Sequence, residues 1–453
     1  VQKIAEIFGQ FKNPDKETVL TPWRVVNMHM SDCLGGYNFY NADFTEPLDE
    51  PVFVDRGKVT QDTLSNPNAK ILEINSKTGL YPLYVAYSIF RCKIDKIPLN
   101  EQTADTVWEL WTQTVAENVF VICKTPMAKA ITRRTLLGYK PGKVNAHYFE
   151  DIINQLKNKP EQFKEKVTRG SYWGRKETVM KFDAVVGNPP YQTVNKGDGT
   201  GADPVYHLFI DAARSISNMG SFIHPARFLF HAGKTPKEWN DKMLNDEHFR
   251  VVNYWSNSAD IFPNVDVKGG IAITMWNRNA CFGKINFFSP YSELHKIVEK
   301  VNRKDFISFS SIIYPRDLYH LTEALYIDNP ELLNRQSKGH KFDCGSNVFS
   351  VFPEVFLKQK PQEFATYARV VGKNKNVREY RWIKKDYLKT PDNFNYYKVF
   401  VPKANGSGTF GEPLANPIIG EPCDAHTVTF LSIGKYEIKS EAFATLNYIK
   451  TKF

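Results

Sequence analysis

The sequence predicts an α/β domain with a mostly parallel sheet, followed by a second domain of mixed α+β structure. Between about residues 66 and 285, short apolar runs alternate with helix-like segments, which is the pattern of βαβ units. After about residue 285 this alternation is lost, aromatic residues and lysines interleave, and glycine and proline turns become dense. The length of 453 residues also exceeds that of one ordinary domain. We therefore place a domain boundary near residue 285.

The elements of the α/β region can be placed in chain order. An amphipathic helix is expected near residues 22–30, inside an N-terminal segment that extends to about residue 65. Two further helices are expected, at residues 82–90 and 128–137. Strands are expected at residues 69–73, 118–123, 183–187, 220–224, 251–255 and 270–276. The last two of these runs are typical of a closing hairpin.

Composition and charge narrow the classes of protein. The chain is 42% hydrophobic, so it can bury a substantial core, and its net charge of +10 suits a polyanionic partner such as nucleic acid. Its six cysteines contain no C-x-x-C pair, which argues against a zinc site or a disulfide framework and favours a cytoplasmic setting. No apolar run reaches the ~18 residues of a membrane span, so no membrane association is expected.

The two ends of the sequence suggest a part of a larger protein. The chain begins with Val1 rather than with methionine. A helix-like stretch at residues 446–453 runs to the last residue. We therefore expect this chain to be a piece of something longer.

The most informative stretch is the turn Asn188-Pro189-Pro190-Tyr191, which follows an apolar run. The Asn188 side-chain oxygen and the Pro189 carbonyl can both accept hydrogen bonds from an exocyclic amino group, which directs the nitrogen lone pair toward an electrophilic methyl group. Neither proline has an N–H, and each fixes its own φ, so the turn is rigid. Tyr191 offers a ring on which a flipped base can stack. The alternative is a turn that only ends a strand, as in many α/β proteins.

Several motifs occur in the order found in a known enzyme family. They are the pair Thr21-Pro22 and the stretches at residues 71–79, 188–191, 203–210, 220–229 and 266–273. In this order they resemble the gamma-class N6-adenine DNA methyltransferases, particularly the large enzymes of type IIG and related restriction-modification systems. The resemblance covers nearly the whole chain. It implies a Rossmann-like domain that transfers methyl from S-adenosylmethionine (SAM) to a flipped adenine in double-stranded DNA.

The resemblance also implies a role for each part of the chain. Residues 1–65 would form a helical segment that packs on the cofactor site, and residues 66–285 would form the catalytic domain. Residues 286–453 would form the DNA target-recognition domain, whose recurrent strand is similar to residues 396–403. Related systems often fuse nuclease or helicase regions to such an enzyme, and these would lie in a longer parent chain.

Site residues are implied wherever the chain matches the motifs of the family. The catalytic turn comprises Asn188, Pro189, Pro190 and Tyr191. The residues that would bind SAM are Thr21, Glu73, Gly79, Cys123, Asp151 and Asn188. The transfer needs no metal, because positioning and hydrogen-bond polarisation suffice.

The departures from the family pattern fall in the cofactor half. Lys77 stands where a glycine is usual, and Cys123 stands where an acid usually accepts hydrogen bonds from the ribose hydroxyls. The resemblance implies an acid for the adenine ring of SAM, which would be Asp151 or Glu150, although the closest register places Tyr148 in that position. A packed thiol is the simpler interpretation of Cys123, and a surface acid at a strand end is the alternative for Glu73.

A basic cluster in the second domain is the candidate for DNA contact. It comprises Lys373, Lys375, Arg378, Arg381, Lys384 and Lys385. Tyr380 and Trp382 are interleaved with these residues. Side chains of these types reach base edges and phosphates, while an ordinary solvated basic face is the alternative.

Two other functions remain open at this point. Asn-Pro-Pro-Tyr also occurs in methyltransferases that act on protein glutamine or on RNA, but the long basic second domain argues against such a substrate. A DNA-binding recognition subunit with a degenerate SAM site is the other alternative, because Lys77 and Cys123 depart from the family pattern.

Overall fold

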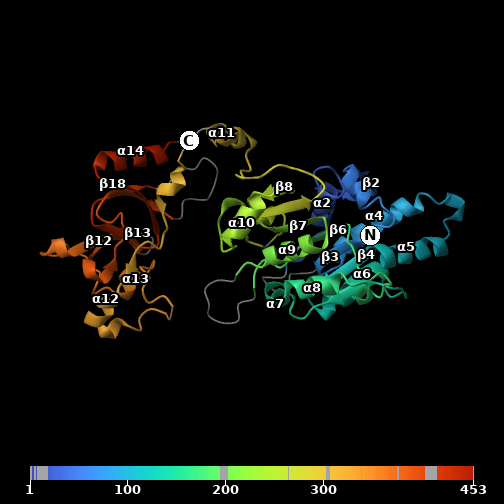
Figure 1. The fold of residues 1–453 in the computed structure, drawn as a ribbon, viewed down its shortest axis with the longest axis horizontal. Coiled ribbons are helices and arrows are strands. Elements are labelled where there is room, and N and C mark those ends of the chain that lie inside the picture. Colours follow the sequence, from blue (N-terminus) through green and yellow to red (C-terminus); the bar gives the residue numbers. More distant parts are fainter. Residues whose placement is uncertain are drawn as a thin grey trace. The chain divides into compact units, whose positions relative to one another are not determined.

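A computed structural model describes residues 3–4, 7, 19–193, 203–263, 265–302, 307–337, 339–374, 377–403 and 416–451. The chain divides into two compact units, Val1–Lys300 and Val301–Phe453 (Figure 1). The division falls within helix α11 (Ser292–Asn302), later than the boundary that the sequence predicts near residue 285. The N-terminal segment belongs to the same unit as the α/β region.

Within the described residues, the first unit is built on a seven-stranded sheet with the order β5-β4-β3-β6-β7-β9-β8. The strands are β3 (Ile71–Ser76), β4 (Val119–Cys123), β5 (Asn145–Tyr148), β6 (Ala184–Gly187), β7 (Met219–Pro225), β8 (Phe249–Trp255) and β9 (Ile271–Asn277). The strands from β5 to β7 in this order run parallel. Strand β9 pairs antiparallel with both β7 and β8. The predicted mostly parallel sheet and closing hairpin are therefore confirmed.

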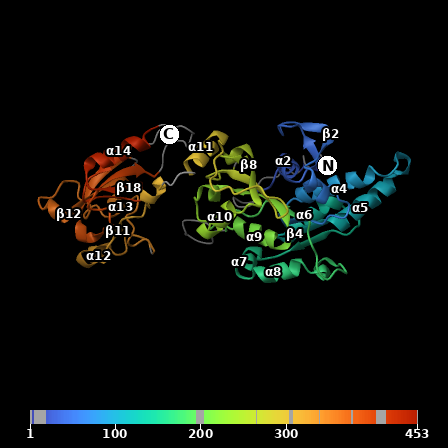
Figure 2. The same ribbon diagram turned by 45° about the horizontal axis from the view of Figure 1, so that its top comes forward.

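Helices cover both faces of the sheet, as in a doubly wound, Rossmann-like fold. The helices that share the first apolar core are α2 (Trp23–Cys33), α4 (Leu80–Ile94), α5 (Ala104–Asn118) and α6 (Pro126–Leu137). The helices that share the second core are α7 (Ile152–Asn158), α8 (Pro160–Val167), α9 (Tyr206–Ile216) and α10 (Lys237–Leu244). Figure 2 shows α2 and α4 on one side of the sheet and α7 and α8 on the other. Val121 and Ile122 of β4 enter different cores, because successive strand residues point to opposite faces.

The N-terminal segment packs onto the sheet domain. Helix α2 covers the amphipathic stretch expected near residues 22–30. At its start, the ring of Trp23 lies 6.1 Å from that of Tyr84 on α4. After α2 come the antiparallel strands β1 (Gly36–Tyr40) and β2 (Pro47–Val54) and the short helix α3 (Lys58–Asp62). Helix α2 therefore shares its core with the central strands.

The strand order reverses at the carboxyl ends of β3 and β6, and this switch point is called the crevice below. From the central strand β3 the chain builds β4 and β5 on one side and then returns to place β6 and β7 on the other. Ligands of such folds bind at the carboxyl ends of the strands where the order reverses, here β3 and β6. The two strands approach closely at this point, since a Cβ on Gly187 would lie 2.5 Å from the carbonyl oxygen of Ile74.

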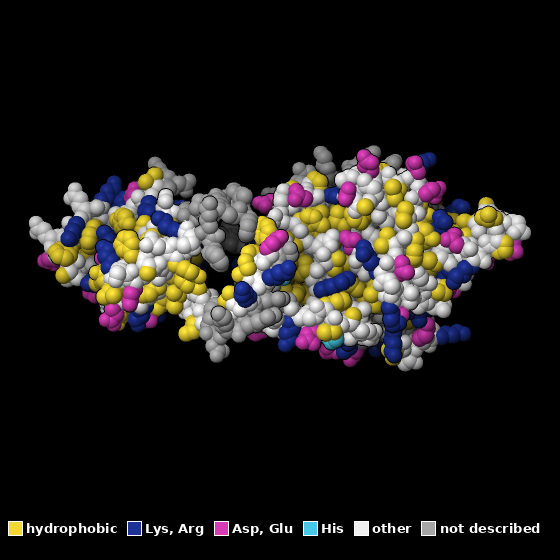
Figure 3. All heavy atoms as spheres, turned by 90° about the horizontal axis from the view of Figure 1, so that it is seen from above, with side chains coloured by type: hydrophobic (Ala, Val, Ile, Leu, Met, Phe, Trp, Pro, Cys, Tyr) yellow, Lys and Arg dark blue, Asp and Glu magenta, His cyan; other side chains and the backbone are white. Residues whose placement is uncertain are grey.

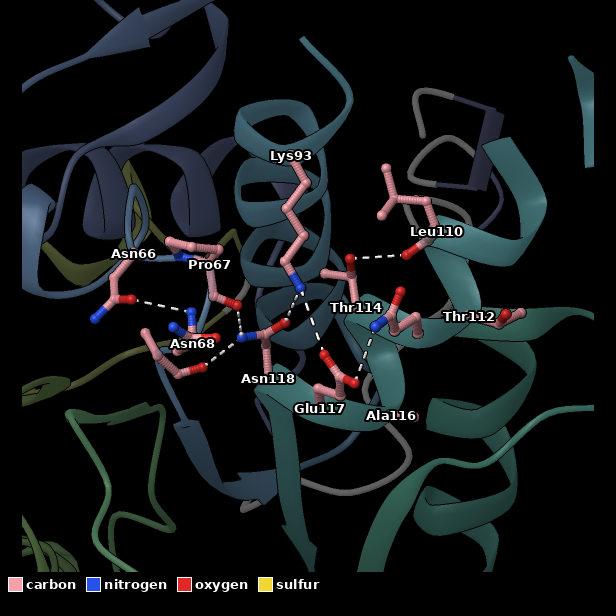
Figure 4. A network of polar contacts seen from close by, with 12 residues as sticks. Asn66, Pro67, Asn68, Lys93, Leu110, Thr112, Thr114, Ala116, Glu117 and Asn118 are labelled. Carbon is pink, nitrogen blue, oxygen red and sulfur yellow. Dashed lines mark hydrogen bonds and ion pairs between the residues drawn. The ribbon is translucent and has the colours of Figure 1, made fainter. Parts of the chain in front are cut away.

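A polar network fastens the opposite edge of the sheet (Figure 4). Asn118, which precedes β4, donates its side-chain amide to the carbonyls of Pro67 at 2.9 Å and Ala69 at 2.7 Å. Lys93 of α4 donates to the Asn118 side-chain oxygen at 2.8 Å and lies 3.8 Å from the Glu117 carboxylate. These bonds fix the amino-terminal ends of β3 and β4, whereas the crevice lies at the carboxyl ends of the strands.

The second unit is a mixed α+β domain, as the sequence predicts. Its helices are α12 (Glu323–Asp328), α13 (Val348–Val351) and α14 (Lys439–Ile449). Its larger strands are β12 (Tyr367–Asn374), β13 (Val377–Lys384), β15 (Tyr397–Pro402) and β18 (Phe430–Tyr436). Its shorter strands are β10 (Ile313–Tyr314), β11 (His320–Leu321), β14 (Leu388–Lys389), β16 (Ile418–Gly420) and β17 (Asp424–His426). Helix α14 ends at Ile449, earlier than the helical stretch expected to reach residue 453.

Candidate active site

Three chain segments meet at the crevice. They are residues 19–21 before α2, residues 75–79 at the end of β3 and in the loop that follows it (the β3 loop), and the turn at residues 188–191 after β6. Asn188 contacts both other segments: its side-chain Nδ2 donates to Thr21 Oγ1 at 3.0 Å, and its main-chain carbonyl accepts from Asn75 Nδ2 at 2.8 Å. Asn75 adopts a φ of 72°, a left-handed conformation that asparagine tolerates better than most residues. The turn is thus held from two sides.

The side-chain oxygen of Asn188 is an acceptor without a partner. Asn188 is only 3% exposed, and its Oδ1 makes no hydrogen bond with any residue that the structure describes. The bond to Thr21 uses the amide nitrogen and therefore leaves Oδ1 for another donor. A buried acceptor without a partner costs about 1–3 kcal/mol, so a ligand that donates an N–H here recovers that free energy.

The rest of the turn is rigid and partly open. Pro189 and Pro190 are buried and have no N–H. The Tyr191 carbonyl accepts from the Val205 N–H at 3.1 Å, which anchors the end of the turn near α9. The Tyr191 hydroxyl points inward, where burial raises its pKa and the neighbouring Asn188 side chain opposes that shift, while its ring is only partly buried. A ring in this position leaves a surface on which a planar group can stack.

Glu73 is a buried carboxyl within β3, three residues before the end of that strand. Its side chain is 5% exposed, and its Oε2 makes no hydrogen bond within the described residues. Burial raises the pKa of Glu73 from its ordinary 4.5 to about 8, although Ser76 and the ammonium of Lys77 oppose that shift. Glu73 is therefore protonated near neutral pH, and a cation or a strong hydrogen-bond donor at Oε2 favours its ionised form.

Gly79 serves the packing of the loop onto helix α6. It begins α4 with a φ of 77°, and a Cβ at this position would lie 2.9 Å from the Cα of Thr132. The Thr78 carbonyl accepts from Thr135 Oγ1 at 2.6 Å, and Ser76 Oγ lies 3.1 Å from Thr132 Oγ1. A glycine at this point brings the β3 loop against the start of the helix, where a ligand can approach main chain.

The two other residues predicted at the cofactor site lie at neighbouring strand ends. Cys123 ends β4, is fully buried in the first core, and has a thiol whose pKa burial raises to about 12. It is therefore a neutral, packed thiol on the same face as Glu73. Asp151 follows β5, is exposed, and precedes α7, with Glu150 exposed beside it and Tyr148 39% exposed. Asp151 thus lies two strands away from Glu73 in the sheet.

A second polar network at the site has no signal in the sequence. The His29 ring on α2 lies 2.6 Å from the Tyr81 hydroxyl on α4 and 2.7 Å from Ser221 Oγ on β7, measured from its two nitrogens. Burial lowers the pKa of His29 to about 3, so the imidazole is neutral. Burial raises the pKa of the Tyr81 hydroxyl, and the nearby Glu73 and Tyr191 raise it further. This network fixes α2 beside the crevice.

The structure separates the members of the predicted basic cluster. Lys373 faces Arg378 across the β12–β13 pair, Lys384 is exposed at the end of β13, and Lys385 follows it. Arg381 is only 5% exposed and forms an ion pair with Glu379, while Lys375 lies outside the described residues. Tyr380 is 40% exposed, with the Arg369 guanidinium 4.9 Å from its ring centre. Figure 3 shows lysine and arginine side chains beside hydrophobic ones on this unit.

Comparison with known proteins identifies part of the chain. Residues 117–262 match the family model described as the Eco57I restriction-modification methylase. An uncharacterized adenine-specific methylase of Mycoplasma pneumoniae (strain ATCC 29342 / M129 / Subtype 1) is 34% identical over 104 residues. That match covers 22% of this chain and 25% of the relative, so it spans a quarter of the length of that curated protein.

Several solved structures are similar over much of the chain. The ATP-dependent Type ISP restriction-modification enzyme LlaBIII bound to DNA has a TM-score of 0.47 and 11% identity, covering 98% of this chain and 38% of its own. A nuclease-deletion mutant of the Type ISP restriction-modification enzyme LlaGI, in complex with a DNA substrate mimic, has a TM-score of 0.49 and 10% identity. That match covers 95% of this chain and 44% of the LlaGI chain. Within the described residues, no helix is long and apolar enough to cross a membrane. Residues 117–262 match the model of the Eco57I restriction-modification methylase family, and this match and the adenine-specific relative confirm the predicted resemblance to N6-adenine methyltransferases of restriction-modification systems.

Proposed function

We propose that this protein methylates the N6 amino group of adenine in double-stranded DNA, with SAM as the methyl donor. The observation that carries this proposal is the buried, unpaired Oδ1 of Asn188, which the bond to Thr21 orients at the switch point of the sheet. The family match and the adenine-specific relative support the same chemistry.

The catalytic turn would act by holding the amino group. Asn188 Oδ1 and the Pro189 carbonyl would each accept one N–H, which draws the nitrogen lone pair out of conjugation with the ring. Tyr191 would stack on the flipped adenine, as in other enzymes that extrude their target base. When bound, SAM supplies an electrophilic methyl group: the nitrogen–carbon bond forms as the carbon–sulfur bond breaks, its electron pair stays on sulfur, and the surplus amino proton leaves to water.

The residues at the end of β3 fit such a donor. Glu73 presents an unpaired carboxyl oxygen that suits the ammonium group of the methionine part. The loop up to Gly79 brings main chain close to the crevice. At the end of β4 the usual acid is replaced by the buried thiol of Cys123, so the ribose would lack that partner, and Asp151 would hold the adenine ring of the donor.

The second unit would read the DNA. Lys373, Arg378, Lys384 and Lys385 supply positive charge for phosphates and base edges, and Tyr380 supplies an exposed ring. Arg381, which is buried and paired with Glu379, would act indirectly by shaping strand β13. We expect nuclease or helicase regions in a longer parent chain and a cytoplasmic setting, as for a restriction-modification system.

A DNA-binding recognition subunit without donor binding is the second candidate. The buried Cys123 thiol in place of an acid is the observation that favours it. Calorimetric titration with SAM separates the two functions without knowledge of the DNA site. Saturable one-to-one binding supports the methyltransferase, whereas no detectable binding, even with DNA present, makes the recognition subunit the better assignment.

The variant Asn188→Ala tests the proposed chemistry. Transfer of tritiated methyl groups to unmethylated bacterial DNA is expected to fall by at least about 10²-fold, because one of two acceptors is lost. Much of the DNA affinity is expected to remain. The control Asn188→Asp keeps an acceptor oxygen and should retain more activity than the alanine variant. Full activity in Asn188→Ala would refute the assignment.

A further inference from the structure

Lys77 joins the N-terminal segment to the catalytic turn. Its Nζ donates to the Val19 carbonyl at 2.7 Å and to the main-chain carbonyl of Asn188 at 3.4 Å. Lys77 lies in the β3 loop, Val19 lies just before α2, and Asn188 follows β6. One ammonium therefore contacts two segments that are far apart in the sequence.

These contacts close a ring through the catalytic asparagine. Asn188 donates its side-chain amide to Thr21 at 3.0 Å, and two residues earlier the Val19 carbonyl accepts from Lys77. Lys77 then returns to the carbonyl of Asn188. The ring therefore runs from the Asn188 amide through residues 21 to 19 and Lys77 to the Asn188 main chain. Without Lys77, residues 19–21 lose their bond to the β3 loop. These residues include Thr21, whose hydroxyl orients the Asn188 amide.

We propose that Lys77 is a positioning residue, which holds residues 19–21 against the catalytic turn and so fixes the direction of Asn188 Oδ1. This inference rests on the proposed methyl transfer at Asn188. It gives a role to the residue that departs most clearly from the glycine-rich loop of the family.

The chemistry of a lysine suits this role. An ammonium on a four-carbon stem has three donors and can meet carbonyls on two separate segments. Methionine has a comparable stem and no donor. Asn75 also donates to the Asn188 carbonyl, at 2.8 Å, so the turn itself should keep its place when Lys77 is replaced. The expected defect therefore lies in residues 19–21 and in the direction of the Asn188 amide.

The kinetic test compares Lys77→Met and Lys77→Arg with a matched control. Lys93→Met removes another part-buried ammonium that holds an asparagine, at the opposite edge of the sheet (Figure 4). For Lys77→Met we expect kcat to fall on the order of tenfold to a hundredfold, as for a displaced catalytic group, with a much smaller change in KM for SAM. Lys77→Arg keeps the donors and should recover part of kcat. Lys93→Met should keep wild-type kcat.

Hydrogen exchange of the substrate-free proteins tests the same ring without catalysis. The peptide covering residues 19–26 should exchange faster in Lys77→Met than in wild type, and at the wild-type rate in Lys93→Met. Unchanged exchange in Lys77→Met overturns the proposal, and so does faster exchange with an unchanged kcat. A wild-type protein that transfers no methyl group refutes the proposed function, while the exchange comparison still decides whether Lys77 closes the ring.

Discussion

Replacing Glu73 by glutamine removes a carboxyl that the fold keeps protonated. The unfolded chain ionises Glu73 near its ordinary pKa of 4.5, whereas burial holds the pKa in the folded protein at about 8. Between these values the unfolded state binds fewer protons, so stability falls as pH rises. Each pH unit contributes about 1.4 kcal/mol, which amounts to about 3 kcal/mol at pH 7. Glutamine resembles the neutral carboxyl and does not incur this cost.

The assay is urea unfolding of substrate-free wild type and Glu73→Gln at pH values from 5 to 8. We expect a small difference at pH 5 and a growing advantage for the variant up to pH 8. The control Glu177→Gln alters a surface carboxylate that pairs with Lys70 at 3.0 Å, and its difference from wild type should not grow over this range. A pH-independent difference for Glu73→Gln, or a growing advantage for wild type, would refute the reasoning about Glu73.

Three further outcomes follow from the same structure. Binding of the cationic donor should ionise Glu73 and release a proton near pH 7. The calorimetric heat of binding should therefore differ between phosphate and Tris buffers for wild type, because the buffer takes up that proton, but not for Glu73→Gln. Equal heats in both buffers for wild type would contradict this. Thr21→Val should lower kcat because it removes the acceptor for the Asn188 amide, and Thr21→Ser should restore it; equal rates for the two variants would show that the hydroxyl is not needed. Replacing Arg378 and Lys384 by alanine should weaken DNA binding and reduce its salt dependence. Arg381→Ala should leave the salt dependence unchanged and lower stability, because it removes the ion pair with Glu379. An equal salt dependence of DNA binding in these variants would contradict the assignment of Arg378 and Lys384 as DNA contacts.

The positions of the sheet strands other than β5 could be predicted because apolar runs alternate with helical segments along the α/β region. Helix α5 was not expected, since within it only Thr114, Val115 and Asn118 are buried. A helix that is mostly exposed has a weak apolar stripe. The two units divide after Lys300, later than the predicted boundary near residue 285. Most of α11 belongs to the first unit although it lies beyond the point at which strands and helices cease to alternate.

The candidate site could be predicted only where a short motif carries the chemistry. Asn188 and Glu73 stand out because each ends or follows an apolar strand. The contacts of Lys77 and His29 join segments that are far apart in the sequence, and no local pattern specifies them. The inward position of Arg381 follows from the alternation of side chains along β13, which separates it from Lys384 on the opposite face.

Identification of the methylated product tests the central claim most directly. DNA without prior methylation would be incubated with the protein and isotopically labelled SAM, digested to nucleosides and analysed by mass spectrometry, with Asn188→Ala in parallel. We expect the label in N6-methyladenine, and its loss in the variant. Label in cytosine, in RNA or in protein glutamine, or equal labelling by wild type and Asn188→Ala, would contradict the assignment of Asn188 as the group that holds the adenine amino nitrogen.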